Sequence, residues 1–169
     1  MSDRQGGQGG LWGPLLGAAA GAYVMHARHA ARRESRAYKD DPEFVDEVCE
    51  EVEEFLGRWT PRQAHRKERG YTLDLAAFLR RHTDFDVEVE PATEEGFPDI
   101  IVGGVLVIEL KLRASKAELD RLVGQAARYS RKFETWVLLL GSTESQVRQF
   151  EWLLEDRDLE MIEVWTTDT

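Results

Sequence analysis

The sequence predicts an α/β protein with a central mixed β-sheet flanked by helices. Two apolar runs, residues 105–112 and 135–140, are continuous rather than alternating, as in strands that are buried on both faces. Stretches with helical spacing of apolar residues precede, separate and follow these runs. The expected order of elements from residue 61 onward is αβββαβαβ. Helices that alternate with buried strands favour a sheet covered on both faces.

An acidic amphipathic helix is predicted over residues 42–56, as an outer layer or a linker. Asp41 has the side chain of a good N-cap, and Pro42 suits the first helical position because its missing N–H needs no partner there. Apolar residues then recur at helical spacing until Gly57, which is expected to end the helix.

A second helix is expected to begin at Thr60 and to end near His82. Thr60 followed by Gln63 forms a capping-box pattern. After this helix, the alternation of residues 86–90 indicates a strand. The glycine pair at 103–104 separates two further strands and indicates a hairpin turn.

The remaining elements continue the alternation of helices and strands. A helix is expected over residues 116–132, and the buried strand 135–140 follows it. A helix over 145–154 and a last strand over 161–165 complete the predicted sheet.

Length, cysteine content and charge restrict the class of protein. The 169 residues suffice for one α/β domain with a core. A single cysteine, Cys49, excludes an intramolecular disulfide, a four-cysteine zinc site and an iron–sulfur cluster, so a reducing cytoplasm is the expected location. The net charge of −10 disfavours nucleic-acid binding over the whole surface, but residues 58–82 and 109–132 carry +5 and +4. These two basic segments flank the candidate site, as expected if one face meets phosphates.

Residues 1–40 are expected to form a disordered or apolar N-terminal segment. Within it, residues 11–25 carry no charge. As a helix this run would span about 22 Å, short of the roughly 30 Å hydrocarbon core of a bilayer. Its GxxxG spacing of glycines and the basic stretch that follows favour membrane contact at the cytoplasmic face, with a packing helix or a loose tail as the alternative.

Two carboxylates and a lysine interrupt the apolar strands between residues 96 and 112. Because side chains alternate along a strand, Glu109 and Lys111 point to the same face, about 6.6 Å apart along the backbone. Burial of Glu109 costs several kcal/mol unless a cation offsets its charge, and Lys111 or a divalent metal ion would do so. A Glu–Lys pair at a sheet end, or a strand rim exposed to water, is the alternative explanation.

Pro98-Asp99, followed ten residues later by Glu109-Leu110-Lys111, resembles the signature of the PD-(D/E)xK nuclease superfamily. The resemblance implies that Asp99 and Glu109 bind Mg²⁺, or Mn²⁺ in its place, and that the backbone carbonyl of Leu110 joins them. It also implies that Lys111 orients or activates the attacking water. These residue types suit the chemistry, because Mg²⁺ prefers hard oxygen ligands and an ammonium offsets developing negative charge.

The resemblance covers about residues 62–140 and implies a restriction-endonuclease-like core in a nuclease-like domain at 61–169, preceded by an acidic helix and linker at 41–60. It implies hydrolysis of phosphodiester bonds in DNA, in repair, recombination or defence. A homodimer or a complex with a partner subunit is compatible with this function. The competing hypothesis is a nucleic-acid-binding or scaffold protein with the same fold, tethered to a membrane by residues 11–25, that no longer cleaves.

The hairpin must meet one geometric condition if the two carboxylates are to share a metal ion. A two-residue turn at Gly103-Gly104 would pair Asp99 with Ile108 and put Asp99 on the face opposite to Glu109. A three-residue loop or a bulge would bring both carboxylates to one face, and glycine permits either because it adopts positive φ. An irregular hairpin is therefore predicted.

Three further residues resemble accessory positions of the superfamily. Gln125 and Tyr129 are four residues apart and share a helix face, as in the QxxxY motif of RecB-like members, which helps to position nucleic acid or catalytic groups. An ordinary exposed helix face is the alternative. Glu68 resembles the metal-assisting glutamate that members carry on the first core helix, and pairing with a neighbouring basic residue is the alternative.

Six basic residues are candidates for a phosphate-binding surface around the site, with a solvated helix face as the alternative: Arg113, Lys116, Arg121, Arg128, Arg131 and Lys132. No HExxH spacing, Ser-centred nucleophile motif or GxxxxGK[ST] phosphate loop occurs in the sequence. Use of ATP is therefore not indicated.

Overall fold

The computed structural model describes residues 41–159 and 162–167, which contain a five-stranded sheet in the order β1-β2-β3-β4-β5. Its strands are β1 (Val87–Val89), β2 (Ile100–Val102), β3 (Leu106–Leu112), β4 (Glu134–Leu140) and β5 (Glu163–Thr167). The pairs β1–β2 and β2–β3 are antiparallel, whereas β3–β4 and β4–β5 are parallel. The predicted α/β class with a central mixed sheet is thus confirmed.

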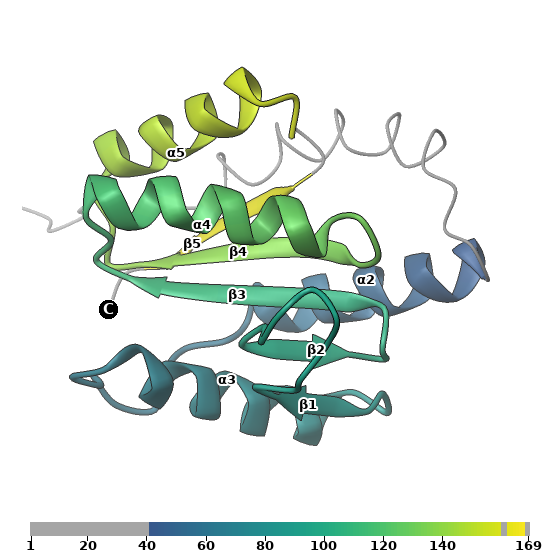
Figure 1. Ribbon diagram of the computed structural model, residues 1–169. Helices are drawn as coiled ribbons and strands as arrows, with labels where there is room; N and C mark the ends of the chain where they lie inside the picture. Colours follow the sequence, from purple (N-terminus) through teal and green to yellow (C-terminus); the bar gives the residue numbers. More distant parts are fainter. Residues whose placement is uncertain (1–40, 160–161, 168–169) are drawn as a thin grey trace, which may run out of the picture. The chain divides into compact units, whose positions relative to one another are not determined.

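Helices cover both faces of this sheet (Figure 1). They are α2 (Pro42–Leu56), α3 (Glu68–His82), α4 (Lys116–Tyr129) and α5 (Glu144–Asp156). Apolar residues of α2 and α3 form one core cluster with the sheet, and those of α4 and α5 form another. Along the described chain the elements follow one another as α2, α3, β1, β2, β3, α4, β4, α5 and β5.

The alternation of side chains in β3 and β4 divides them between the two clusters. Ile108 and Leu110 pack toward α2 and α3. Val137 and Leu139 pack toward α4 and α5. Each of these side chains is almost fully buried, and burial of one such side chain stabilises a fold by roughly 1.5 to 3 kcal/mol. Continuous apolar runs are therefore required in both strands.

The ends of α2 agree with the prediction. The backbone N–H of Phe44 donates to the side chain of Asp41 over 3.2 Å, Pro42 occupies the first turn and Gly57 is the C-cap. The predicted helix 116–132 is shorter in the structure, because α4 ends at Tyr129 and the next residues form a tight turn.

The expected start of the second helix at Thr60 was wrong, because α3 begins at Glu68. The preceding segment is held by side chains of α3 instead of by helical hydrogen bonds. The N–H of Arg62 donates to Asp74 Oδ2 over 2.8 Å, and the N–H of His65 donates to the hydroxyl of Tyr71 over 3.1 Å. These tertiary contacts outweigh the local capping pattern.

The hairpin between β2 and β3 has the predicted irregularity. Val102 pairs with Leu106, so the loop contains the three residues 103–105. Gly103 and Gly104 have φ angles of 60° and 70°, which favour glycine. The prediction of an irregular hairpin is confirmed.

No helix within the described residues is long and apolar enough to cross a membrane. The predicted membrane contact through residues 11–25, like the whole expected N-terminal segment 1–40, lies outside the described residues.

Candidate functional site

Asp99 comes immediately before β2, opposite Glu109 on β3. Ile100 pairs with Ile108, and continuation of this register by one residue sets Asp99 against Glu109. Residues directly opposite each other in an antiparallel pair share a face. Glu109 in turn pairs with Val137 of β4, whose side chain packs toward α4 and α5. Both carboxylates therefore lie on the α4 side of the sheet.

The edge of β3 beyond β2 is capped by two carboxylates. β2 begins at Ile100, which pairs with Ile108. The N–H groups of Leu110 and Leu112, further along β3, therefore have no strand neighbour on that side. The N–H of Leu110 donates to Asp99 Oδ2 over 2.8 Å, and that of Leu112 donates to Glu68 Oε2 over 2.9 Å. The N–H and C=O of one strand residue point to the same side. The carbonyl of Leu110 thus faces the same gap as Asp99 and Glu68.

Glu109 is buried without full hydrogen bonding. Glu109 is 5% exposed, and its Oε1 atom has no hydrogen-bond partner among the described residues. Burial, followed by the charge of Asp99, raises the pKa of Glu109 to about 8. Burial also raises the pKa of Asp99 to about 6, with a smaller contribution from the charge of Glu68. Without a cation, the pair therefore retains a proton near neutral pH.

Lys111 lies on the same strand face as Glu109 and contacts Glu68. Its Nζ atom donates to Glu68 Oε1 over 2.8 Å, and the two side chains are 25% and 30% exposed. Both oxygens of Glu68 thus accept hydrogen bonds from β3, one from Lys111 and one from Leu112. These contacts support a role for Glu68 in orienting Lys111, whereas its predicted contact with a metal ion stays a prediction.

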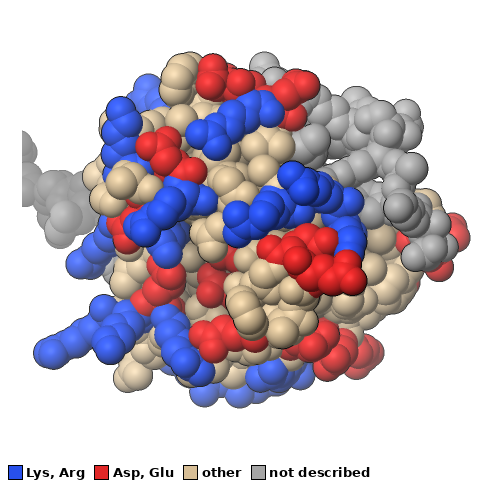
Figure 2. All heavy atoms as spheres, viewed as in Figure 1, with Lys and Arg blue, Asp and Glu red and all other residues tan. Residues whose placement is uncertain are grey.

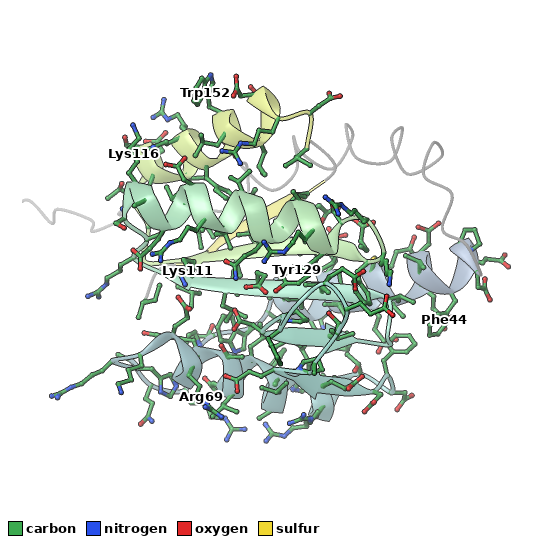
Figure 3. All side chains as sticks on the ribbon, in the orientation of Figure 1. Phe44, Arg69, Lys111, Lys116, Tyr129 and Trp152 are labelled. Atoms are coloured by element: carbon green, nitrogen blue, oxygen red, sulfur yellow. The ribbon has the colours of Figure 1, made fainter. Side chains whose placement is uncertain are left out.

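Helix α4 brings Gln125 and Tyr129 to the site. Tyr129 is 1% exposed, and burial together with the charge of Glu109 raises its pKa to about 12. Its hydroxyl donates a hydrogen bond to the side chain of Glu109. Gln125 lines an open hollow beside Lys111. In Figure 3, Lys111 and Tyr129 lie in the space between α4 and β3.

The open hollow along α4 has a volume of about 440 Å³ and is lined by Lys111, Glu118, Arg121, Gln125 and Arg128. Of the six basic candidates, Arg121 and Arg128 are in this lining. Lys132 instead forms ion pairs with Glu94 and Glu95. In Figure 2, Lys and Arg side chains gather along α4, with acidic side chains beside them. The hollow thus carries three cationic side chains, and it reaches Lys111, which lies two residues from Glu109 on β3.

Two residues near this site, Glu118 and Phe97, were not predicted from the sequence. Glu118 lines the hollow, where it also forms a capping box with Ser115. Phe97, two residues before Asp99, is 72% exposed. The S-x-x-E spacing could have identified Glu118 as a cap, but no periodicity marks an exposed aromatic residue in a loop.

The residues at the site fit a divalent cation in part. Within residues 41–159 and 162–167, no three Asp, Glu, His or Cys side chains converge as a metal site. Asp99 and Glu109 form a pair, and the nearby Leu110 carbonyl adds a third oxygen. Mg²⁺ commonly takes only one or two carboxylates and completes its shell with water and substrate phosphate. A cation bound between the two carboxylates would give Glu109 Oε1 a partner and would lower the raised pKa values of the pair.

The fold and the site define an α/β protein with a paired-carboxylate centre at the edge of a mixed sheet. Comparison of the chain with protein-family models, with curated proteins and with solved structures finds no significant match.

Proposed function

We propose that the protein is a metal-dependent nuclease that hydrolyses phosphodiester bonds in DNA. Asp99, Glu109 and Lys111 are its catalytic residues, and Mg²⁺, for which Mn²⁺ can substitute, is its cofactor. The main observation in support is the three-residue hairpin loop, because this loop length puts Asp99 on the same face of the sheet as Glu109. A two-residue loop would have separated the carboxylates. We also propose that the sheet and its helices form a restriction-endonuclease-like core.

Burial of these carboxylates opposes folding. Their presence despite this cost favours a catalytic role over a structural one. Two acids with strongly raised pKa values, next to an ammonium and a hollow, are typical of catalytic sites. At a purely structural sheet edge, an apolar residue at position 109 would avoid the cost of the unpartnered Glu109 Oε1 atom.

Asp99, Glu109 and the Leu110 carbonyl would hold the cation. When bound, it would polarise the scissile phosphate and lower the pKa of a water molecule. The oxygen ligands and their negative charge suit Mg²⁺ rather than a softer metal ion.

Lys111 would supply positive charge next to the attacked phosphate. Lys111 lines the hollow, and its ammonium donates to Glu68 Oε1 over 2.8 Å. A fixed ammonium stabilises the negative charge that develops on the phosphate, and it orients water through its N–H groups. Glu68 is therefore proposed as the residue that positions Lys111.

Tyr129 and Gln125 would support the reacting groups from α4. The Tyr129 hydroxyl donates to Glu109 and so restricts the rotation of that carboxylate. Gln125 lines the hollow together with Lys111 and Arg128, and its amide would hydrogen-bond there to a nucleotide or to water.

A cleavage assay tests this function. The purified 169-residue chain is incubated with circular single-stranded DNA and with linear duplex DNA, in Mg²⁺, Mn²⁺ or EDTA. We expect cleavage of at least one substrate that requires the cation and is lost in Lys111→Ala. Trp152→Ala, on the outer helix α5, is the matched control and should retain activity. Absence of cleavage and of metal-dependent binding would instead favour the scaffold hypothesis.

A further inference from the structure

Phe97 is an exposed aromatic residue next to the candidate site. Only three large apolar side chains are exposed in the part of the chain that the structure describes, namely Leu73, Phe97 and Trp152. Phe97 is the most exposed of these, at 72%, and precedes Asp99 by two residues. A ligand that covered this ring would remove its apolar surface from water, which would stabilise the complex.

The loop that carries Phe97 is fixed to the protein. Thr93 and Gly96 exchange two backbone hydrogen bonds of 2.8 and 3.3 Å. Lys132 holds the loop through Glu95 over 3.0 Å and also through Glu94. On the other side of Phe97, Pro98 is buried. The ring is thus presented to solvent by an anchored loop.

The same loop borders the basic hollow. Arg128, which lines the hollow, donates from Nε to the backbone oxygen of Glu95 over 3.4 Å. Gly96 packs closely on Tyr129, since a Cβ at this glycine would lie 3.3 Å from the tyrosine hydroxyl. Phe97 therefore follows a segment that contacts both the hollow and the carboxylate site.

Glu118 weakens the positive character of the hollow only in part. Its Oε2 atom accepts from the N–H and hydroxyl of Ser115 over 2.8 and 2.6 Å, which directs it to the helix N-cap. Lys111, Arg121 and Arg128 supply three cationic groups in the same lining. An anionic ligand with more than one phosphate fits this arrangement.

We infer that the substrate is single-stranded nucleic acid, with its phosphates along the α4 hollow and one base stacked on Phe97. This inference rests on the proposed function and adds the substrate class. A stacking platform beside a basic groove is the usual way to bind a single strand. In a duplex both faces of each internal base are stacked on neighbours, so Phe97 would receive a base only after local opening, which costs energy.

Binding of matched oligonucleotides tests the inference. A fluorescent single strand and its duplex are titrated with the full chain in Ca²⁺, with wild type, Phe97→Ala, Phe97→Trp and Trp152→Ala. We expect tighter binding of the single strand by wild type. Phe97→Ala should weaken that binding roughly 5- to 100-fold, Phe97→Trp should preserve it, and Trp152→Ala should leave it unchanged. A 2-aminopurine base in the strand should be quenched by wild type and not by Phe97→Ala.

The outcomes separate the inference from the proposed function. Equal affinity for duplex and single strand, or unchanged single-strand binding in Phe97→Ala, would overturn the inference, even if cleavage that depends on Lys111 is observed. Binding of the single strand that depends on Phe97, without any cleavage, would support the inference and count against the nuclease.

Discussion

The carboxylate of Asp99 lies opposite that of Glu109 across the β2–β3 hairpin, and each alters the titration of the other. Tyr129 donates to Glu109 from the side of α4, and the N–H of Leu110 donates to Asp99 from the strand edge. Two acids held together in this way oppose folding when both are ionised.

Stability without divalent cations is expected to fall as pH rises from about 5 to about 8. The pKa of Asp99 is raised from 3.8 to about 6 and that of Glu109 from 4.5 to about 8, so the folded state binds more protons than the unfolded state in this window. The free energy of unfolding then decreases with pH, by an amount on the order of a few kcal/mol. Urea denaturation in EDTA across this range measures it.

Glu109→Gln provides the control for this pH dependence. The variant lacks the titrating group, so its free energy of unfolding should change much less between pH 6 and pH 8. Glu54→Gln, on the exposed surface of α2, should behave as wild type. A wild-type protein that is more stable at pH 8 than at pH 5 in EDTA would contradict the burial of an ionisable pair.

The two hairpin glycines should differ in their tolerance of alanine. Both have positive φ, which costs alanine about 1 kcal/mol. At Gly103 a Cβ would also lie 2.9 Å from Val48 Cγ2, whereas at Gly104 it would meet open space. Gly103→Ala should therefore lower the free energy of unfolding by clearly more than Gly104→Ala. Denaturant titrations compare the two, and equal losses would refute the close contact with α2.

Much of the fold was predictable because its strongest signals are local. The apolar runs of β3 and β4 require burial on both faces, and the α2 caps depend on neighbours in sequence. The start of α3 was not predictable, because Asp74 and Tyr71 bind the preceding segment through contacts that no short pattern encodes.

Glu68→Gln should reduce the cleavage rate more than substrate binding. The variant can still accept from Leu112 but loses the charged contact with Lys111. Hydrogen bonds to charged groups contribute roughly 1.5 to 3 kcal/mol, so a loss of about 10- to 100-fold in the single-turnover rate is expected. Glu54→Gln, which breaks an exposed pair with Arg58, is the matched control and should have no effect. An unchanged rate in Glu68→Gln would show that Glu68 does not position Lys111 for catalysis.

Tyr129→Phe should impair catalysis, whereas Tyr71→Phe should not. Both rings are buried, and each hydroxyl makes a hydrogen bond, to Glu109 and from the N–H of His65 respectively. Each variant should lose about 1 kcal/mol of stability. Only Tyr129→Phe should reduce the cleavage rate of the folded protein, by roughly 10-fold. Equal rates in the two variants would show that the Tyr129 hydroxyl has only a structural role.

The candidate site was predictable in part. Strand alternation predicted that Glu109 and Lys111 share one face of the sheet. It also predicted that Asp99 lies on this face only if the hairpin loop has three residues or a bulge. The contact between Glu68 and Lys111 spans 43 residues of sequence and depends on how α3 packs against β3. The exposure of Phe97 likewise results from the tertiary position of its loop.

Calorimetric titration of the cation-free protein with Mn²⁺ at pH 7, in two buffers of different ionisation enthalpy, measures whether Asp99 and Glu109 bind a metal ion. We predict one bound ion per chain and release of about one proton, because binding displaces the proton shared by Asp99 and Glu109. Asp99→Asn and Glu109→Gln should each weaken binding by at least about 10-fold, and Lys111→Ala should retain it. Undiminished Mn²⁺ binding in both carboxylate variants, or no binding to wild type, would contradict the metal site.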